Sequence, residues 1–359
     1  MKLIKAHAMN YRNIIDSNPV EIGRSTCLVG KNEAGKTAFL KALECLRSTN
    51  PEFKSYGKTE NYPRRYLSEY DNRHEDGDAI VMRTEWELEA ADIKAIETIF
   101  GSGVLKSNVF SIQKAYEQDV ATWTVSIDEE KALENLVRRL ALDQTDKTPL
   151  VAAKSTKAAL KILEALPTPT ERQAELLAAI RKFREGSAHL HAIDTLNGRT
   201  PKFLYFSHYD RMSGALSINK MNTDKQQGRP LDSGDRVFLD FLEYAGTTIE
   251  ELAALDKFEE LNAKCEAAAL RITEQIFEYW TQNDDLEITV VLSEGKAADP
   301  APFNSGPIAR ARVKNTLHGV TVPFSERSAG FIWFFSFLVK FAQIKKSHGN
   351  VILLLDEPG

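Results

Sequence analysis

The sequence predicts an α/β fold built on a parallel core sheet, with an antiparallel β layer and an inserted helical subdomain. A glycine-rich loop joins a short apolar segment at 25–29 to a helical pattern at 37–46. Apolar and polar residues alternate along 80–88 and again along 109–127, as in half-buried antiparallel strands. From about 129 to 199 the chain becomes rich in Ala, Leu, Lys and Glu with helical spacing.

The loop Gly30–Thr37 reads Gly-Lys-Asn-Glu-Ala-Gly-Lys-Thr and fits the pattern G-x-x-x-x-G-K-[ST] of phosphate-binding loops. Ser25–Val29 is predicted as a buried strand before it, and Thr37–Leu46 as a helix after it. A helix N-terminus and the loop backbone then offer N–H groups and a positive dipole end to a triphosphate. A glycine-rich turn with a surface lysine is the alternative, and it leaves the flanking strand and helix unexplained. The predicted nucleotide-binding residues are Gly30, Lys31, Asn32, Glu33, Ala34, Gly35, Lys36, Thr37 and Ala38.

Composition bounds the class of protein. The 359 residues suffice for one large or two ordinary domains, and the net charge of −5 gives no general attraction to nucleic acid or anionic membranes. Cys27, Cys45 and Cys265 are odd in number and far apart, which argues for reduced thiols in a cytoplasmic protein. We expect Cys27 and Cys45 to be packed beside the loop. No export signal is visible, and the most apolar run, Phe331–Val339, is too short to span a bilayer, so we expect no membrane contact.

The remaining elements follow in order along the chain. Further strands are predicted at Leu3–Met9, Val20–Ile22, Ile80–Leu88, Val109–Tyr116, Ala121–Ile127, Phe203–Phe206, Leu286–Leu292, Ala309–Asn315 and Val320–Phe324. Further helices are predicted at Glu129–Leu142, Val151–Leu166, Thr170–Arg184, Arg236–Tyr244, Ile249–Thr281 and Phe331–Val339.

These elements predict a nucleotide-binding head at 1–128 and 200–359, interrupted by the helical subdomain at 129–199. Packing or a partner surface explains that subdomain better than a DNA clamp. The long loop at 47–78 carries Tyr62-Pro63-Arg64-Arg65, for which a solvated loop and a nucleotide or DNA contact both stay open.

The C-terminal run Val351–Leu355 ends in Asp356 and Glu357. A continuous apolar run suits a parallel strand buried on both faces. Asp356 at its carboxyl end can hold Mg²⁺ through water, opposite Thr37 as the second ligand, and Glu357 can deprotonate the attacking water. Alone, the run could be a buried strand and a turn. Together with the phosphate loop it predicts ATP hydrolysis, with Lys36 and Glu357 as the catalytic residues.

The segment Ser325–Phe331 enters the apolar run from a polar stretch. Ser328 and Gly330 lie at or near the N-terminus of that predicted helix, where a hydroxyl and free N–H groups suit a γ-phosphate. A serine N-cap followed by a glycine is the better local explanation. The position about twenty residues before the strand that ends in Asp356 and Glu357 favours the phosphate contact.

In this order the motifs resemble the ABC-type ATPase heads of the SMC and RecF group, most closely the ATPase part of OLD-family (overcoming lysogenization defect) proteins. The resemblance rests on Asn10-Tyr11-Arg12, the loop Gly30–Thr37, Glu326–Phe331 and Leu355–Gly359, so it covers both ends of the chain. It implies an ABC-type head in which Lys36 binds the β- and γ-phosphates of ATP, and Thr37 and Asp356 hold Mg²⁺. Ser328 and Gly330 would complete the site of a second subunit, which implies a homodimer or higher homo-oligomer formed through ATP.

In OLD-like proteins a TOPRIM nuclease follows the ATPase, which implies control of DNA processing, including antiviral defence. The segment 325–330 lacks the double glycine of ABC signatures, and the sequence given stops at Gly359, before the switch histidine and any TOPRIM domain. We expect a fragment. Gln113 is at most a weak candidate for the Mg²⁺-sensing glutamine. The alternative functions are a non-catalytic ATP-dependent switch or assembly module and a P-loop kinase.

Overall fold

The computed structural model describes residues 1–50, 53, 55–75, 77–253, 258–277 and 285–357. The chain divides into two compact units, Met1–Phe203 and Leu204–Gly359. It is a mixed α/β protein with antiparallel sheets and a small parallel sheet. Within the described residues, no helix combines the length and the apolar sequence needed to cross a bilayer.

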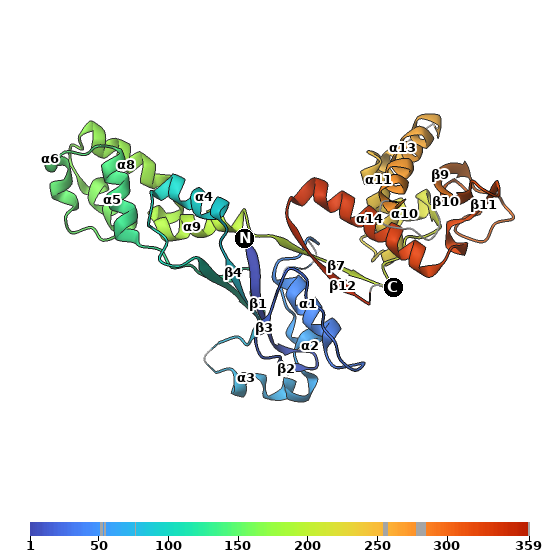
Figure 1. Ribbon diagram of the computed structural model, residues 1–359, viewed down its shortest axis with the longest axis horizontal. Coiled ribbons are helices and arrows are strands. Elements are labelled where there is room, and N and C mark those ends of the chain that lie inside the picture. The colour runs from blue at the N-terminus through green and yellow to red at the C-terminus, as the bar shows by residue number, and fades with distance from the viewer. Residues whose placement is uncertain (51–52, 54, 76, 254–257, 278–284, 358–359) are drawn as a thin grey trace. The chain divides into compact units, whose positions relative to one another are not determined.

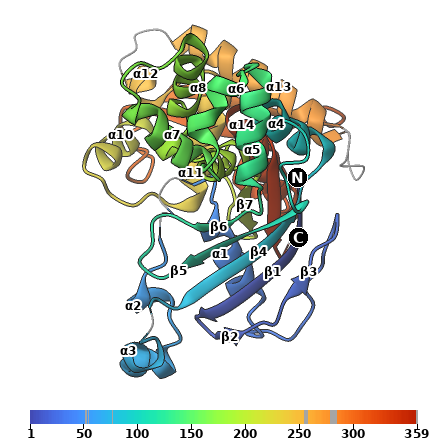
Figure 2. The same cartoon turned by 90° about the vertical axis from the view of Figure 1, so that its left-hand side faces the viewer.

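The first unit is organised around an antiparallel sheet (Figures 1 and 2). Its order is β2 (Ile14–Asp16), β1 (Lys2–Tyr11), β4 (Ile80–Glu87), β5 (Val109–Ala115) and β6 (Thr122–Thr124), and β3 (Val20–Glu21) pairs with β1. The predicted alternation is confirmed from Met82 onward, because Met82, Thr84 and Trp86 are buried while Arg83 is exposed, but Val81, expected on the opposite face, is buried as well, next to a register shift between Ile80 and Met82. Trp86 lies opposite both Leu3 and Phe110, so large apolar pairs fix the register of the three central strands.

Helix α1 (Lys36–Leu46) contacts β1 and β4. Its sequence predicts an apolar face of Phe39, Leu40, Leu43 and Leu46, of which Phe39, Leu43 and Leu46 are buried and Leu40 is partly buried. The long loop that follows contains short helices, namely α2 (Lys58–Asn61), η1 (Arg64–Glu69) and α3 (Tyr70–Arg73).

The helical stretch predicted at 129–199 is confirmed as a set of helices. They are α5 (Glu129–Arg139), α6 (Gln144–Lys147), η2 (Thr148–Leu150), α7 (Thr156–Ala165), α8 (Glu171–Arg181), η3 (Arg184–Gly186) and α9 (Ala188–Asn197). Asp128, Ser155 and Thr170 accept hydrogen bonds from first-turn backbone N–H groups, which sets where α5, α7 and α8 begin. α4 (Ala90–Phe100) packs against α5 and α9 and was not predicted from the sequence.

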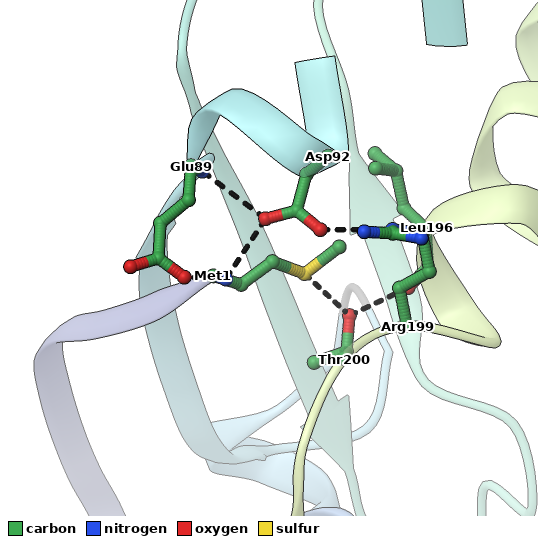
Figure 3. Close-up of polar contacts among 6 residues, drawn as sticks. All are labelled: Met1, Glu89, Asp92, Leu196, Arg199 and Thr200. Carbon is green, nitrogen blue, oxygen red and sulfur yellow. Dashed lines mark hydrogen bonds and ion pairs between the residues drawn. The ribbon is translucent and has the colours of Figure 1, made fainter. Parts of the chain in front are cut away.

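The N-terminal ammonium group joins the sheet to α4 and to the end of α9 (Figure 3). The Met1 nitrogen lies 2.6 Å from Glu89 Oε2 and 2.8 Å from Asp92 Oδ2. Asp92 is 3% exposed, and its other carboxylate oxygen accepts from Arg199 Nε at 2.8 Å. Burial lowers the pKa of the ammonium group, but its bonds to Asp92 and Glu89 outweigh that effect and raise it above 8.0. Burial raises the pKa of the Asp92 carboxyl, yet its bonds to the ammonium group and Arg199 bring it below 3.8.

Asp92→Asn is expected to lower the free energy of unfolding by about 2–3 kcal/mol at neutral pH, because two cations lose the negative charge of their shared buried partner and one of its two oxygens. The raised pKa of the ammonium group means that its contribution is complete below pH 8.0 and is lost as the pH rises through the folded pKa. The lowered pKa of Asp92 means that its contribution is present above pH 3.8 and is lost at more acid pH.

Urea titrations at pH 7 and pH 10 test the pH dependence expected from the ammonium group, with the exposed Asp71→Asn as the control. If the stability difference between the wild-type protein and the Asp92→Asn variant does not shrink at pH 10, the assignment is wrong.

The second unit combines an antiparallel sheet, a parallel strand pair and a layer of helices. β9 (Leu286–Glu294) pairs with β10 (Pro307–Asn315) along its length, and the other edge of β10 pairs with β8 (Ala215–Ser217) and β11 (Val320–Pro323). The helices are α10 (Ile218–Gln226), α11 (Ser233–Tyr244), α12 (Ile249–Ala253), α13 (Phe258–Phe277), η4 (Phe324–Glu326) and α14 (Ala329–His348). The core lies where α11, α13 and α14 pack together and α13 covers β9.

The helix predicted over Ile249–Thr281 is found as α12 and α13, and 254–257 and 278–281 lie outside the described residues. Cys265, Ala268 and Ile272 of its apolar stripe are buried as expected. α14 continues past Val339 to His348, so the helix is longer than its apolar run.

The parallel part of the fold is smaller than predicted. β12 (Val351–Asp356) forms a two-stranded sheet with β7 (Lys202–Ser207), and no phosphate-loop core sheet is evident among the described residues. The prediction that 351–355 is buried on both faces is wrong, since Leu353 is 37% exposed. β12 has β7 as its one neighbour among the described strands.

The predicted strand Ser25–Val29 is also wrong. The segment has no regular secondary structure, Val29 is 90% exposed, and Cys27 is exposed rather than packed. A strand is stable when a neighbour pairs with its N–H and C=O groups, and no described strand pairs with this one. Cys45 is buried, as expected.

Candidate functional site

The predicted phosphate loop forms a tight turn that enters α1. Ala34 N–H donates to the Lys31 carbonyl at 3.2 Å, and Gly35 is the N-cap residue of α1 with φ 96°. A Cβ on Gly35 would lie 3.1 Å from Ile14 Cγ1, so both the backbone angle and the space favour glycine. Glu33 also has a positive φ of 64°, and its carbonyl accepts from Asn13 Nδ2 at 2.7 Å. The turn is therefore held from the β1–β2 connection as well as from α1.

Lys36 folds its side chain back over the loop. Its Nζ donates to the carbonyls of Gly30 and Lys31, both at 2.9 Å. This places a cation beside the loop backbone, and the two residues whose carbonyls hold it are exposed. The side chain can leave them for a stronger acceptor at a cost of about 1 kcal/mol per hydrogen bond.

The first turn of α1 presents free donors. Among the described residues, the backbone N–H groups of Gly35 and Lys36 donate to no acceptor, and the first turn of α1 has no acidic residue. Free N–H groups and the helix dipole make this end of α1 able to bind an anion. Lys31, Asn32, Glu33 and Ala34 are exposed around it, as is Thr37, while Ala38 is buried and faces the core.

The second predicted group of residues lies at the carboxyl end of β12. Asp356 is 9% exposed, and its Oδ2 accepts from the Tyr205 hydroxyl at 2.7 Å. Glu357 follows with φ 50°, in the left-handed region that a side chain rarely adopts, and its side chain is 65% exposed. His208 Nδ1 lies 3.4 Å from Glu357 Oε2. A buried carboxylate and an accessible one thus stand next to each other in the chain.

The segment before α14 forms a serine N-cap, as its local sequence indicates. Ser328 is the N-cap residue of α14, and its Oγ accepts from the Phe331 N–H at 3.4 Å. Gly330 lies in the first turn, and Ser328 is exposed. Arg327 Nε is buried and has no hydrogen-bond partner in the part of the chain that the structure describes. The hydroxyl cap does not exclude a phosphate contact, which stays a prediction.

No protein-family model matches this chain, and a search of curated proteins finds no significant match.

The structure brings together only part of the predicted site. Lys36 and the loop belong to the first unit, while Asp356, Glu357, Ser328 and Gly330 belong to the second. Each group is assembled within its own unit, and their union in one nucleotide site stays a prediction. Gln113 lies on β5, where its Oε1 accepts from Arg83 Nε at 3.1 Å.

Sequence reasoning missed Tyr205 and His208. Tyr205 lies within β7 and His208 directly after it, and β7 is the strand beside β12, so they meet Asp356 and Glu357 through the pairing of two distant segments. A polar residue directly after an apolar strand is the signal that could have found His208.

The available donors limit the kind of metal site that the chain can form. Among the described residues, no group of three or more His, Cys, Asp and Glu side chains could hold a metal ion. Magnesium bound with a nucleotide takes one or two protein oxygens and otherwise keeps water and phosphate ligands. A metal held by three or more such protein ligands does not fit the described residues, and the predicted sharing of Mg²⁺ by Thr37 and Asp356 stays a prediction.

Proposed function

We propose that this chain binds ATP through the loop Gly30–Thr37, hydrolyses it, and dimerises on it. The conformation of the loop carries the proposal. Gly35 has the left-handed backbone angle, Lys36 lies over the loop, and the backbone N–H groups of Gly35 and Lys36 have no acceptor among the described residues. A helix start of this kind suits a phosphate chain.

For binding, the loop backbone from Gly30 to Gly35 surrounds the phosphates, and Lys36 moves from the two carbonyls to the β- and γ-phosphates. Thr37 and Asp356 would hold Mg²⁺, which when bound neutralises charge on the phosphates. Glu357 accepts a proton from the attacking water, a role that its accessible carboxylate allows.

The finer fold class, an ABC-type head with an inserted helical subdomain, belongs to this proposal. The antiparallel layer of the first unit and the parallel pair that ends in Asp356 and Glu357 support it. In such a head Ser328 and Gly330 contact ATP held by a second copy, so ATP joins a homodimer or higher homo-oligomer. By resemblance to the OLD family, the dimer regulates a TOPRIM nuclease domain or chain and so controls DNA processing in antiviral defence.

The second candidate is a switch or assembly module that binds ATP without hydrolysing it. The segment 25–29 favours it, because this segment forms no strand beneath the loop. A P-loop kinase is the third candidate, and the pair Asp356–Glu357 argues against it. The deciding measurement follows ATP labelled with ³²P at the γ-phosphate, using the intact chain. Phosphate release supports the ATPase, binding without release supports the switch, and label on an added small acceptor supports the kinase.

DNA binding, if it uses the exposed Arg64 and Arg65, is expected to depend steeply on salt. Each phosphate contact contributes about −0.9 to the slope of log K against log salt, so the double alanine variant should flatten the slope by about 2. Lys154→Ala/Lys161→Ala, two exposed lysines of the helical stretch, is the charge-matched control. Fluorescence anisotropy with a labelled duplex, over a range of roughly 50 to 300 mM NaCl, measures it. A salt-independent affinity would remove the basic loop as a DNA contact.

A further inference from the structure

We propose that His208 positions the Glu357 carboxylate for its reaction with water. This inference rests on the proposed ATPase function and adds a residue that the sequence motifs do not assign. Its basis is the meeting of two segments that are far apart in the sequence, since the neighbouring pair Tyr205 and Asp356 are 151 residues apart.

The two strands bring His208 and Glu357 to one edge. β7 ends at Ser207 and β12 ends at Asp356, so each residue is the first one after its strand. In a parallel pair the carboxyl ends lie at the same edge, where loops place reactive side chains. The Tyr205–Asp356 hydrogen bond of 2.7 Å fixes this edge just before the two residues.

The backbone before His208 is held firmly. Trp333 Nε1 donates to the Ser207 carbonyl at 2.9 Å, and the Ser207 N–H and hydroxyl donate to Asp210 Oδ2 at 2.7 and 2.8 Å. The imidazole itself packs against the Tyr209 ring, with centroids 3.7 Å apart. These contacts limit the directions in which the His208 ring can turn.

The Nδ1 atom of His208 is buried and makes no hydrogen bond within the described residues. A buried polar atom without a partner costs about 1–3 kcal/mol, so a native protein keeps one where it has a use. Glu357 Oε2 is 3.4 Å away, outside hydrogen-bond geometry but reached by a small turn of either side chain. As the Nδ1–H tautomer, His208 donates to one carboxylate oxygen and leaves the other to accept the proton of water.

A positioning role predicts a specific pattern among variants at 208. An asparagine side chain carries an N–H₂ group near the place of Nδ1, whereas the glutamine amide reaches toward the place of Nε2. His208→Ala and His208→Gln should therefore lower kcat for ATP hydrolysis by about tenfold to a hundredfold, and His208→Asn should restore most of it. The affinity for mant-ATP should stay within about twofold of wild type in all three. The exposed His318→Ala is the matched control.

A second readout does not use activity. In protein without nucleotide, ¹⁵N-histidine NMR should show a protonated Nδ1 for His208, assigned by its loss in His208→Asn, and this resonance should move in Glu357→Gln. The positioning role would be overturned if the His208 Nδ1 resonance has the same chemical shift in Glu357→Gln as in the wild type. It would also be overturned if His208→Ala has the same kcat as the wild type. Wild-type protein that binds mant-ATP but releases no phosphate would overturn the proposed hydrolysis instead, whatever the NMR shows.

Discussion

Lys36→Ala is expected to abolish ATP binding at micromolar nucleotide. Lys36 Nζ now donates to two backbone carbonyls at 2.9 Å, and a triphosphate is a far stronger hydrogen-bond acceptor for this ammonium group. Loss of its bonds to the phosphates should cost about 3 kcal/mol or more, roughly a hundredfold or greater rise in Kd. Isothermal titration with ATP and Mg²⁺ measures the change.

The fold should survive this substitution, because the two lost hydrogen bonds lie on an exposed loop and are worth about 1 kcal/mol each. Lys94→Ala removes the same charge from an exposed position on α4 and should leave ATP binding unchanged. Unaltered affinity in a folded Lys36→Ala protein would remove Gly30–Thr37 as the nucleotide site.

Glu357→Gln should slow hydrolysis by about 10²–10⁴-fold while leaving ATP binding intact, because the amide cannot accept the proton of water. The neutral side chain keeps the shape of the accessible carboxylate, which is 65% exposed. With turnover blocked, ATP-bound dimers should accumulate and be visible by size-exclusion chromatography with light scattering. Glu266→Gln, which changes an exposed glutamate on α13, provides the control.

Two results would count against this mechanism. A Glu357→Gln protein that stays monomeric at saturating ATP would exclude dimerisation through trapped nucleotide. One that hydrolyses ATP at the wild-type rate would exclude Glu357 as the residue that activates water.

Much of the fold could be predicted where the local pattern and the tertiary contacts agree. The alternation at 80–88 placed Trp86 correctly in the core. The helix start predicted at Glu129 is the start of α5, and the one predicted at Thr170 is one residue before the start of α8. Whether Ser25–Val29 forms a strand could not be predicted from its local pattern. An apolar run is stable as a strand only through a partner strand, and a run of residues does not say which partner is present.

The candidate site likewise has one part that the local sequence predicts and another that depends on tertiary contacts. The loop Gly30–Thr37 is local, so its spacing predicted a glycine-rich turn that leads into a helix, and the structure has that turn before α1. Tyr205 and His208 depend on β7 lying beside β12, a contact between segments far apart in sequence. No short motif carries that information, and the sequence did not predict the left-handed backbone of Glu357 either.

The indole of Trp333 donates a hydrogen bond to the Ser207 carbonyl, just before His208, and so also gives the protein a built-in spectroscopic reporter. The chain has 4 tryptophans, so incorporation of 5-fluorotryptophan gives a small, resolvable set of ¹⁹F signals. The signal of Trp333, identified with Trp333→Phe, is sensitive to the strength of its hydrogen bond and to the stacked Phe337 ring. Events at the carboxyl end of β7 can thus be followed in solution without a dye, a labelled nucleotide or a coupled assay.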